Sequence, residues 1–371
     1  MENSYTQDRP VNPKLRNTIK SDFKKGNFWN NLRREFRNLK DFYIDAEKCD
    51  ELKRMNIFSK AFFYVWWIFK SMILKLTTLR RILLLTGIVL IFVAKINIGL
   101  DSDNSVSILI RGGFLGGAII LFVLMLELKD KLIAKDELDA GRQIQNALKP
   151  EECPQIDGWS AWLFTKPANE VGGDFVDFLK INNNRIIISV ADVAGKGMKA
   201  ALLTTKLQAT VRALAANYGI ENIVGKVNEI FRRDSLRNIF ASLLYLELKP
   251  DSGQLAYVNA GHIPPVIVKS NTVDIMPKGE PALGLFKTYT YSIQSVNINQ
   301  GDIFVAYSDG LTEARNEKGF FYGNDRFVNL LSTLRHLSPE KIGNNIISEV
   351  EKFTGDAPVN DDLSVVILKR L

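Results

Sequence analysis

The chain has 371 residues, of which 24% are charged and 46% hydrophobic, an ordinary composition that excludes a low-complexity chain. At about 150 residues per domain, this length predicts two or three structural units. The two cysteines, Cys49 and Cys153, lie far apart; this excludes a disulfide framework and a cysteine-rich zinc motif and is typical of a reducing compartment.

The net charge of +7 is concentrated near the N-terminus. Residues 1–81 contain 18 lysines and arginines against 9 aspartates and glutamates, a difference of +9. The polar, basic segment 1–56 has no cleavable signal pattern and leads directly into apolar segments. This order favours an anionic membrane surface over nucleic acid, whose binding requires cations and aromatic side chains on one folded face. We predict a basic cytoplasmic N-terminal segment and no nucleic-acid partner.

Residues 57–76 are rich in aromatic side chains but are interrupted by Lys60, Lys70 and Lys75. Aromatic residues with flanking lysines are typical of a helix that lies in the membrane interface. We predict an interfacial aromatic helix here, with a membrane-spanning helix as the alternative. A spanning helix would place the segment 1–56 outside, against the positive-inside rule.

Residues 82–128 contain two apolar segments of about 17–20 residues, which is long enough to span a bilayer. Arg80 and Arg81 precede the first segment, and the loop between the two carries acidic but no basic residues. This distribution predicts a transmembrane helical hairpin with both ends in the cytoplasm, in contact with membrane lipid. Glycine pairs at 112–113 and 116–117 indicate close helix packing.

Residues 129–150 form a predicted linker helix, which Pro150 terminates. Ile133, Ala140 and Ala147 are seven residues apart, a weak heptad that predicts pairing of two copies of the chain, a homodimer, through this helix. From residue 151 the pattern changes to short apolar strands, turns and amphipathic helices. We predict an α+β domain at 151–371, with sheets at the core and helices outside.

Several apolar strands of this domain are bordered by an aspartate in a tight turn. These aspartates are Asp174, Asp192, Asp309 and Asp361, and Asp362 adjoins the last. Clustered carboxylates repel one another unless cations lie between them. Oxygen ligands without a set of His and Cys indicate Mg²⁺ or Mn²⁺ instead of zinc. Two such ions can bind a phosphoryl group and lower the pKa of a bound water molecule.

Six motifs in this domain occur in the order seen in the metal-dependent PPM (protein phosphatase 2C-type) serine/threonine phosphatases. They are EVGGDFVD (170–177), ADVAGKG (191–197), NAGHIPP (259–265), PALGLF (281–286), GDIFVAYSDGLTEARN (301–316) and NDDLSVVILK (360–369). The chain looks most like the bacterial SpoIIE-like branch, which includes phosphatases that act in sigma-factor regulation. The preceding ELDAGRQIQNALKP (137–150) also resembles the entry helix of that branch, so the resemblance covers residues 137–371.

The resemblance implies an αββα sandwich of two antiparallel sheets flanked by helices, with the metal ions in a cleft at one edge. It implies hydrolysis of phosphoserine or phosphothreonine by metal-activated water. The expected substrate is a phosphorylated regulatory protein, an anti-sigma-factor antagonist. In a bacterium, the predicted hairpin would lie in the cytoplasmic (inner) membrane.

Position by position, the resemblance assigns ligands for two Mn²⁺ or Mg²⁺ ions. It implies that Asp192 bridges the two ions, that the Val193 carbonyl binds one of them, and that Asp174 binds the first directly or through water. It implies that Asp309 and Asp361 complete the coordination of the second ion, and that Asp192 and Asp309 are the catalytic residues. The supporting residues are Gly173, Gly195, Gly310 and Asp362.

The proton donor to the leaving group is not evident from the sequence. Other PPM branches have a histidine two residues after the bridging aspartate, where this chain has Ala194. The only histidines, His262 and His336, do not fit that place, so metal-bound water is the expected donor. Lys196 is a candidate substrate-binding residue, with a solvated turn lysine as the alternative.

Two other functions compete with the phosphatase. The turn Gly172-Gly173-Asp174-Phe175 is similar to that of diguanylate cyclases, which would make the chain a nucleotide cyclase-like enzyme. A cyclase gives no role to the aspartates near the C-terminus. The absent histidine leaves a non-catalytic, phosphatase-like signalling receptor as the second alternative.

Overall fold

The computed structural model describes residues 56–96, 105–236 and 238–371. The chain divides into two compact units, one up to Lys131 and one from Leu132 to Leu371. Apart from Asn56, the predicted basic segment 1–56 lies outside the described residues, as does most of the acidic loop.

Three helices make up the described part of the first unit. They are α4 (Ile57–Lys75), α5 (Thr78–Ile96) and the first part of α6 (Ser105–Leu148). Helix α4 covers the predicted interfacial segment. Helix α6 contains both the second predicted hairpin segment and the predicted linker helix without a break.

Helices α5 and α6 pack closely where two glycines meet. A Cβ atom at Gly116 would lie 2.6 Å from the carbonyl oxygen of Gly87 and 2.8 Å from Ile91 Cγ1, so only glycine fits there. A Cβ atom at Gly113 or Gly117 would meet no atom within 4 Å. Of these glycines, Gly116 is therefore the one that permits close packing, and it does so within the hairpin.

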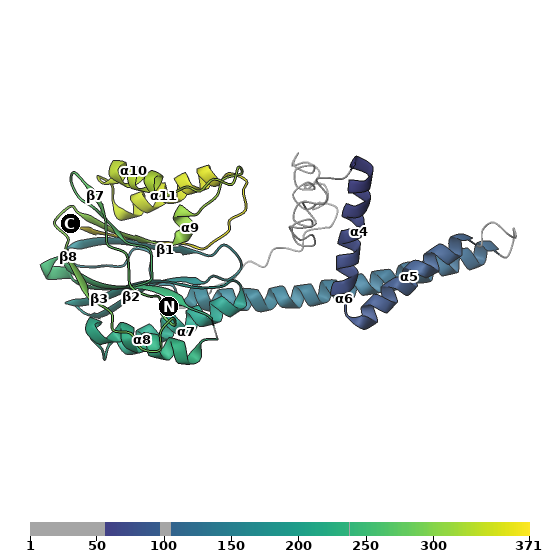
Figure 1. Cartoon of the computed structure of the whole chain (residues 1–371), viewed down its shortest axis with the longest axis horizontal. Helices are drawn as coiled ribbons and strands as arrows, with labels where there is room; N and C mark the ends of the chain where they lie inside the picture. Colours follow the sequence, from purple (N-terminus) through teal and green to yellow (C-terminus); the bar gives the residue numbers. More distant parts are fainter. Residues whose placement is uncertain (1–55, 97–104, 237) are drawn as a thin grey trace, which may run out of the picture. The chain divides into compact units, whose positions relative to one another are not determined.

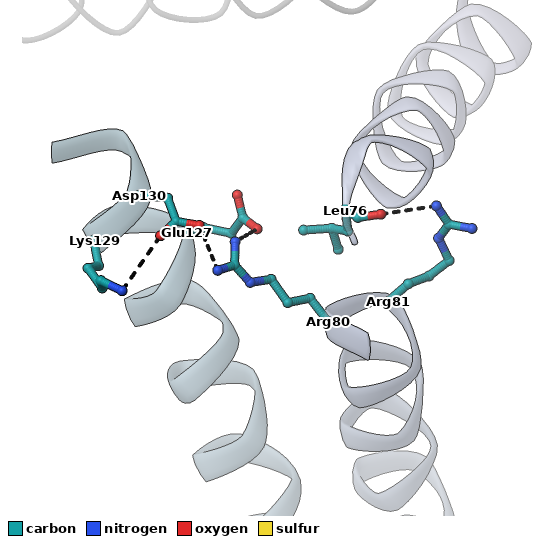
Figure 2. Close-up of polar contacts among 6 residues, drawn as sticks. All are labelled: Leu76, Arg80, Arg81, Glu127, Lys129 and Asp130. Atoms are coloured by element: carbon teal, nitrogen blue, oxygen red, sulfur yellow. Dashed lines mark hydrogen bonds and ion pairs between the residues drawn. The ribbon is translucent and has the colours of Figure 1, made fainter. Parts of the chain in front are cut away.

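Two adjacent arginines at the start of α5 connect the three helices (Figure 2). The Arg80 guanidinium donates to Glu127 Oε1 at 2.7 Å and to Asp130 Oδ2 at 2.6 Å, both on α6. Arg81 donates to three main-chain carbonyl oxygens at the end of α4, each at 3.0 Å. These oxygens belong to Ile73, Leu74 and Leu76. Arg81 thus satisfies acceptors that a helix end leaves unpaired.

Within the described residues, no helix combines the length and the apolar character needed to cross a membrane. The hairpin predicted between residues 82 and 128 exists as α5 and the first part of α6, but its predicted crossing of a bilayer has no support from these helices.

The second unit is a sandwich of two five-stranded antiparallel sheets between two layers of helices (Figure 1). The first sheet has the strand order β1-β10-β9-β6-β7 and the second has the order β2-β3-β4-β5-β8. The first sheet consists of β1 (Trp159–Lys166), β10 (Leu363–Arg370), β9 (Ile303–Tyr307), β6 (Val266–Val268) and β7 (Val273–Ile275). The second consists of β2 (Asp174–Asn182), β3 (Arg185–Val193), β4 (Ala241–Lys249), β5 (Gln254–Ala260) and β8 (Gln294–Asn297).

The helices lie on the two outer faces (Figure 1). Helices α7 (Met198–Ala215) and α8 (Ile220–Asp234) cover the second sheet, and α10 (Asn324–Leu334) and α11 (Pro339–Thr354) cover the first. The short helices are α9 (Asp309–Thr312) and the 3₁₀ turn η2 (Pro250–Ser252). The predicted αββα sandwich is confirmed.

Strand β3 shows why this sequence forms a layered structure. Its side chains alternate between two separate cores, as the two-residue period of a strand requires. Ile186, Ile188 and Val190 face the core between the sheets, whereas Ile187 and Ala191 face the core under α7 and α8. Because both faces are buried, the strand is mostly apolar, and it lies inside its sheet, between β2 and β4.

Strand pairing brings the aspartate turns to one edge of the sandwich. In the second sheet, Asp174 at the start of β2 is paired with Asp192 near the end of β3. In the first sheet, Asp309 follows β9 and Asp361 precedes β10, and these two strands are antiparallel neighbours. At the opposite end of the β2–β3 pair, the register shifts by one residue at Ile181, a β-bulge.

Candidate metal centre

Asp174 and Asp192 form the half of the centre that belongs to the second sheet. Asp174 is buried, and its Oδ2 atom has no hydrogen-bond partner. Burial, followed by the charges of Asp192 and Asp362, raises the pKa of Asp174 well above its ordinary value. Burial, followed by the charges of Asp309 and Asp361, raises the pKa of Asp192 to about 7.

Asp309 and Asp361 form the half that belongs to the first sheet. Asp309 is the first residue of α9, and Asp361 is exposed in the turn before β10. Burial, followed by the charges of Asp361 and Glu313, raises the pKa of Asp309. The structure therefore brings together the four aspartates that the sequence singled out, from positions up to 187 residues apart (361 − 174).

Asp362 holds the loops of the centre together through main-chain groups. Its carboxylate accepts hydrogen bonds from the backbone N–H groups of Ala168 (2.7 Å), Gly173 (2.6 Å) and Asp174 (3.1 Å). Its carbonyl oxygen accepts from Ser308 Oγ at 3.1 Å. Asp362 thereby joins the turn before β2 to the turn after β9, which fits the supporting role assigned to it.

The supporting glycines allow main-chain groups to approach one another. A Cβ atom at Gly173 would lie 2.9 Å from the Val193 carbonyl oxygen, and Gly195 has a φ of 126°, which favours glycine. A Cβ atom at Gly310 would collide with the Asp362 carbonyl oxygen. Close approach at Gly173 leaves the Val193 carbonyl beside the Asp174 turn, where it is a candidate ligand.

Two side chains that sequence reasoning missed hold the glycine turn in place. Gln145 on α6 donates to the Gly172 carbonyl at 2.9 Å and accepts from the Gly172 N–H at 3.1 Å. Thr204 Oγ1 on α7 donates to the Gly173 carbonyl at 2.7 Å. No local sequence pattern marks either residue, because each binds main-chain groups about 30 residues away. The family resemblance of the segment 137–150, which contains Gln145, was the one sequence signal for that residue.

Lys196 spans the two halves of the centre. Its Nζ atom donates to the Asn360 carbonyl oxygen at 2.6 Å, linking the turn after Asp192 to the turn before Asp361. Lys196 is thus neither a phosphate contact in this conformation nor a simple solvated lysine. Its predicted binding of substrate would require the ammonium group to leave this carbonyl.

Neither histidine occupies the place next to Ala194. His262 is buried, and its Nδ1 atom shares a hydrogen bond of 2.8 Å with Oγ of Ser242, the residue paired with Asp192 on β4. Burial lowers the pKa of His262 to about 4, so its imidazole is neutral at physiological pH. His336 is exposed in the turn after α10. That neither histidine replaces the missing one stays a prediction.

The donor set fits hard divalent cations. The donors are carboxylate and carbonyl oxygens, one buried carboxylate oxygen has no partner, and burial followed by mutual repulsion raises the pKa of three of the carboxyl groups. Among the described residues, however, no group of three or more His, Cys, Asp or Glu side chains is arranged closely enough to hold an ion as it stands. The individual ligand assignments stay predictions.

The fold of the second unit, with aspartates at one edge of the sandwich, is that of a class of proteins, the PP2C-type phosphatases. The solved SiaA-PP2C domain of Pseudomonas aeruginosa has a TM-score of 0.57 and 22% identity, covering 65% of this chain and 98% of that one. The RsbU and RsbW domains of Rv1364c from Mycobacterium tuberculosis have a TM-score of 0.50 and 24% identity. The match covers 57% of this chain and 60% of that one. At these identities, the likeness concerns the fold.

Within that class, the family model described as Stage II sporulation protein E (SpoIIE) matches residues 182–371, just over half of the chain. The chain therefore belongs to the SpoIIE family, and the resemblance found in its motifs is confirmed. It is a hydrolase of the PP2C serine/threonine phosphatase type, a metal-dependent class. This membership gives no support to the nucleotide cyclase alternative.

Three curated relatives are similar to part of this chain. Phosphoserine phosphatase RsbU of Bacillus subtilis (strain 168) is 29% identical over 241 residues, covering 64% of this chain and 70% of RsbU. Protein IcfG of Synechocystis sp. is 28% identical over 235 residues, or 56% of this chain and 37% of IcfG. Phosphoserine phosphatase RsbP of Bacillus subtilis (strain 168) is 25% identical over 194 residues, or 49% of this chain and 47% of RsbP. The chain thus spans less than half of IcfG and RsbP.

Proposed function

We propose that this protein removes phosphate from phosphoserine or phosphothreonine of a regulatory protein, expected to be an anti-sigma-factor antagonist. The observation that carries the proposal is the convergence of Asp174, Asp192, Asp309 and Asp361; burial, followed by their mutual repulsion, raises the pKa of three of them. Such crowding is tolerated when cations lie among the carboxylates. The relatives RsbU and RsbP, both called phosphoserine phosphatases, support this substrate class.

In this proposal, the chain's own oxygen atoms hold two Mg²⁺ or Mn²⁺ ions. Asp192, at the end of β3, interacts with the charges of Asp309 and Asp361 and would be the bridging ligand, with the Val193 carbonyl and Asp174 on the side of the second sheet. Asp309 and Asp361 lie on the other side. The bound ions would supply positive charge for the phosphoryl oxygens and a hydroxide nucleophile near neutral pH.

The leaving serine oxygen must receive a proton, and the chain offers no imidazole for this step. Ala194 has no acidic group, and the neutral His262 is buried with Ser242 as its partner. Solvent within the centre is therefore the proposed proton donor. The rate of hydrolysis should consequently show no ionisation that belongs to a histidine.

Attachment to a bacterial cytoplasmic membrane is a further part of the proposal. Its support is the difference of +9 between basic and acidic residues in 1–81 and the exposed apolar side chains of the first unit. Phe62 and Leu79 are 65% and 68% exposed, and Phe114 is 74% exposed. Flotation of the full chain with vesicles that contain phosphatidylglycerol tests this; protein that stays at the bottom of the gradient contradicts it.

We also propose that two copies of the chain form a homodimer through the second part of α6, on the basis of the heptad spacing of Ile133, Ala140 and Ala147. Ile133 and Ile144 are exposed on this helix, which leaves apolar surface for a second copy. Cysteine substituted for Ile133 should give a disulfide-linked dimer under mild oxidation. The same substitution at Asp136, outside the heptad seam, is the control, and equal cross-linking of both variants would count against a defined pair.

Phosphate release by the full chain tests the proposed activity. With Mn²⁺, we expect release from p-nitrophenyl phosphate and from a phosphoserine protein, and its loss in Asp192→Asn and Asp309→Asn. Asp251→Asn, an exposed substitution in the turn η2, is the control. GTP is included in a parallel reaction: a cyclic product would favour the cyclase alternative. Metal binding without any turnover would favour the non-catalytic receptor.

A further inference from the structure

A groove adjoins the candidate metal centre on the side of α11. Its volume is about 390 Å³, within the range of ligand-binding pockets. Four segments line it: residues 166–168 at the end of β1, residues 310–315, the second half of α11, and residues 355–363. All of these belong to the second unit.

The chemistry of the groove is apolar inside and charged at the rim. The inner side chains are aliphatic and at least half-buried: Ala314, Ile347, Val350, Ala357 and Leu363. The rim cations already have partners, because Lys166 pairs with Glu351 at 3.1 Å and the Arg315 guanidinium lies 4.6 Å from the centre of the Phe321 ring. The groove therefore suits an apolar side chain and not a phosphate group.

The groove and the metal centre share residues. Asp361, a candidate ligand, and Gly310, next to Asp309, both line the groove. One wall is the segment 355–361, which Lys196 ties to the other half of the centre through the Asn360 carbonyl. A peptide whose phosphoryl group lies among the aspartates thus continues directly into the groove.

We propose that this groove binds an aliphatic or aromatic side chain of the phosphoprotein substrate and thereby contributes to its selection. An extended peptide advances about 3.3–3.6 Å per residue, so the side chain that enters belongs to a position two or three residues from the phosphorylated residue. The proposal takes its substrate class from the proposed phosphatase activity and adds a determinant of sequence preference outside the metal centre.

A leucine scan tests the proposal on the full chain with Mn²⁺. The substrates are ten-residue phosphoserine peptides in an alanine background, with leucine placed in turn at each of the three positions on either side of the phosphoserine. Leucine at one of the positions two or three residues away should raise kcat/KM about tenfold or more, as burial of its side chain implies. A scan that is flat overturns the proposal.

Variants locate the effect in the groove. Ala357→Trp fills the groove and Ile347→Glu places a charge in it, so each should abolish the gain from leucine. Ile275→Glu, the same change on β7 at a side chain that is 54% exposed and does not line the groove, should preserve the gain. Hydrolysis of p-nitrophenyl phosphate, which does not reach the groove, should change less than about twofold in all three. Parallel losses on the peptide and on p-nitrophenyl phosphate would overturn the proposal.

A binding measurement separates this proposal from the proposed activity. Fluorescent peptides carry phosphonomethylalanine, a non-hydrolysable analogue of phosphoserine, and their affinity is measured by fluorescence anisotropy. Leucine-dependent binding that Ala357→Trp removes supports the groove even if no phosphopeptide is hydrolysed, which would refute the phosphatase activity alone. If light scattering shows that Ala357→Trp changes the oligomeric state and leaves peptide affinity unchanged, the groove is a contact between copies and the proposal fails.

Discussion

The two halves of the candidate metal centre are built in different ways. Asp174 and Asp192 are opposite each other in a ladder of main-chain hydrogen bonds, and both strands lie in a sheet with helices packed on it. Asp309 and Asp361 lie in turns, at the start of a four-residue helix and in the exposed segment before β10. Strand register fixes the first pair, whereas hydrogen bonds between loops position the second.

This difference separates a rigid half from an adaptable half. The carboxylates on the second sheet cannot move apart without breaking strand pairing. Those on the first sheet lie beyond the β9–β10 ladder, in turns held by hydrogen bonds of Ser308, the Asp362 carboxylate and the Lys196 ammonium group. The half that is held by loops also borders the groove, so binding of substrate is expected to act on this half.

Removal of a carboxylate should lower kcat/KM more than any other change. The loss should be larger for a carboxylate in the rigid half than for one in the adaptable half. Asp192→Asn is expected to lower kcat/KM by at least about 10³, because Asp192 lies among the other carboxylates and nothing can replace it. Asp361→Asn should lower it by roughly 10², since Asp361 is exposed and water can take its place. Steady-state rates at saturating Mn²⁺ measure both; equal losses would remove the distinction between the halves.

Loss of the Asp362 carboxylate should destabilise the second unit. Asp362→Ala leaves the buried N–H groups of Gly173 and Asp174 without an acceptor, at a cost of about 2–4 kcal/mol in the free energy of unfolding. Asp362→Asn retains one acceptor oxygen and should cost about half as much. Urea unfolding in EDTA compares the two variants with the wild-type chain, and an Ala variant as stable as the Asn variant would contradict the role of these bonds.

The metal-free chain should lose stability as the pH rises. The pKa of Asp192 is about 7 in the folded chain, compared with about 3.9 in an unfolded chain, so the folded state holds the proton more tightly. Its contribution is fully present below about pH 4 and is lost as the pH rises through about 7, a change on the order of 2–4 kcal/mol. Urea unfolding in EDTA at several pH values should show this fall. It should be reduced in Asp192→Asn and reversed by Mn²⁺; a fall that is unchanged in Asp192→Asn would assign it to other groups.

The smallest expected effect concerns the link between the halves. Lys196→Met removes the hydrogen bond to Asn360 and should raise the Mn²⁺ concentration for half-maximal activity about three- to tenfold, with kcat at saturating Mn²⁺ little changed. Calorimetric titration with Mn²⁺ provides a readout that does not depend on turnover. If Lys196 instead binds the substrate phosphate, KM for the phosphoprotein rises and Mn²⁺ affinity stays the same. Lys199→Met, at an exposed position on α7, is the control.

The sequence predicted the strands and the aspartate turns because both are local, whereas the αββα sandwich was implied by the family resemblance. Alternating apolar residues and Asp-Gly or Gly-Asp turns mark strand ends without reference to the rest of the chain. Convergence of Asp174 with Asp309 is not local, and the order of the motifs, through family resemblance, was what indicated it. The link from Lys196 to Asn360 joins residues 164 apart and leaves no pattern that a spacing rule detects.

In the first unit, the sequence was informative about helices and less so about their arrangement. The predicted linker and the second hairpin segment are one continuous helix, α6, because no proline occurs between Ser105 and Leu148 and the glycines at 112–117 are tolerated. The predicted membrane crossing followed from the apolar content of residues 82–128, and the described helices do not support it. The capping of α4 by Arg81 depends on a turn between helices, which composition does not specify.

The β-bulge at Ile181 bears on where this protein tolerates inserted sequence. The bulge already accommodates one extra residue between the β2–β3 turn and the ladder that pairs Asp174 with Asp192. A length change in the exposed turn at Asn183 and Asn184 can therefore be taken up before it reaches the carboxylates. This turn is a suitable position for a short epitope or fluorophore tag, whereas an insertion at the other end of the same hairpin would separate the two aspartates.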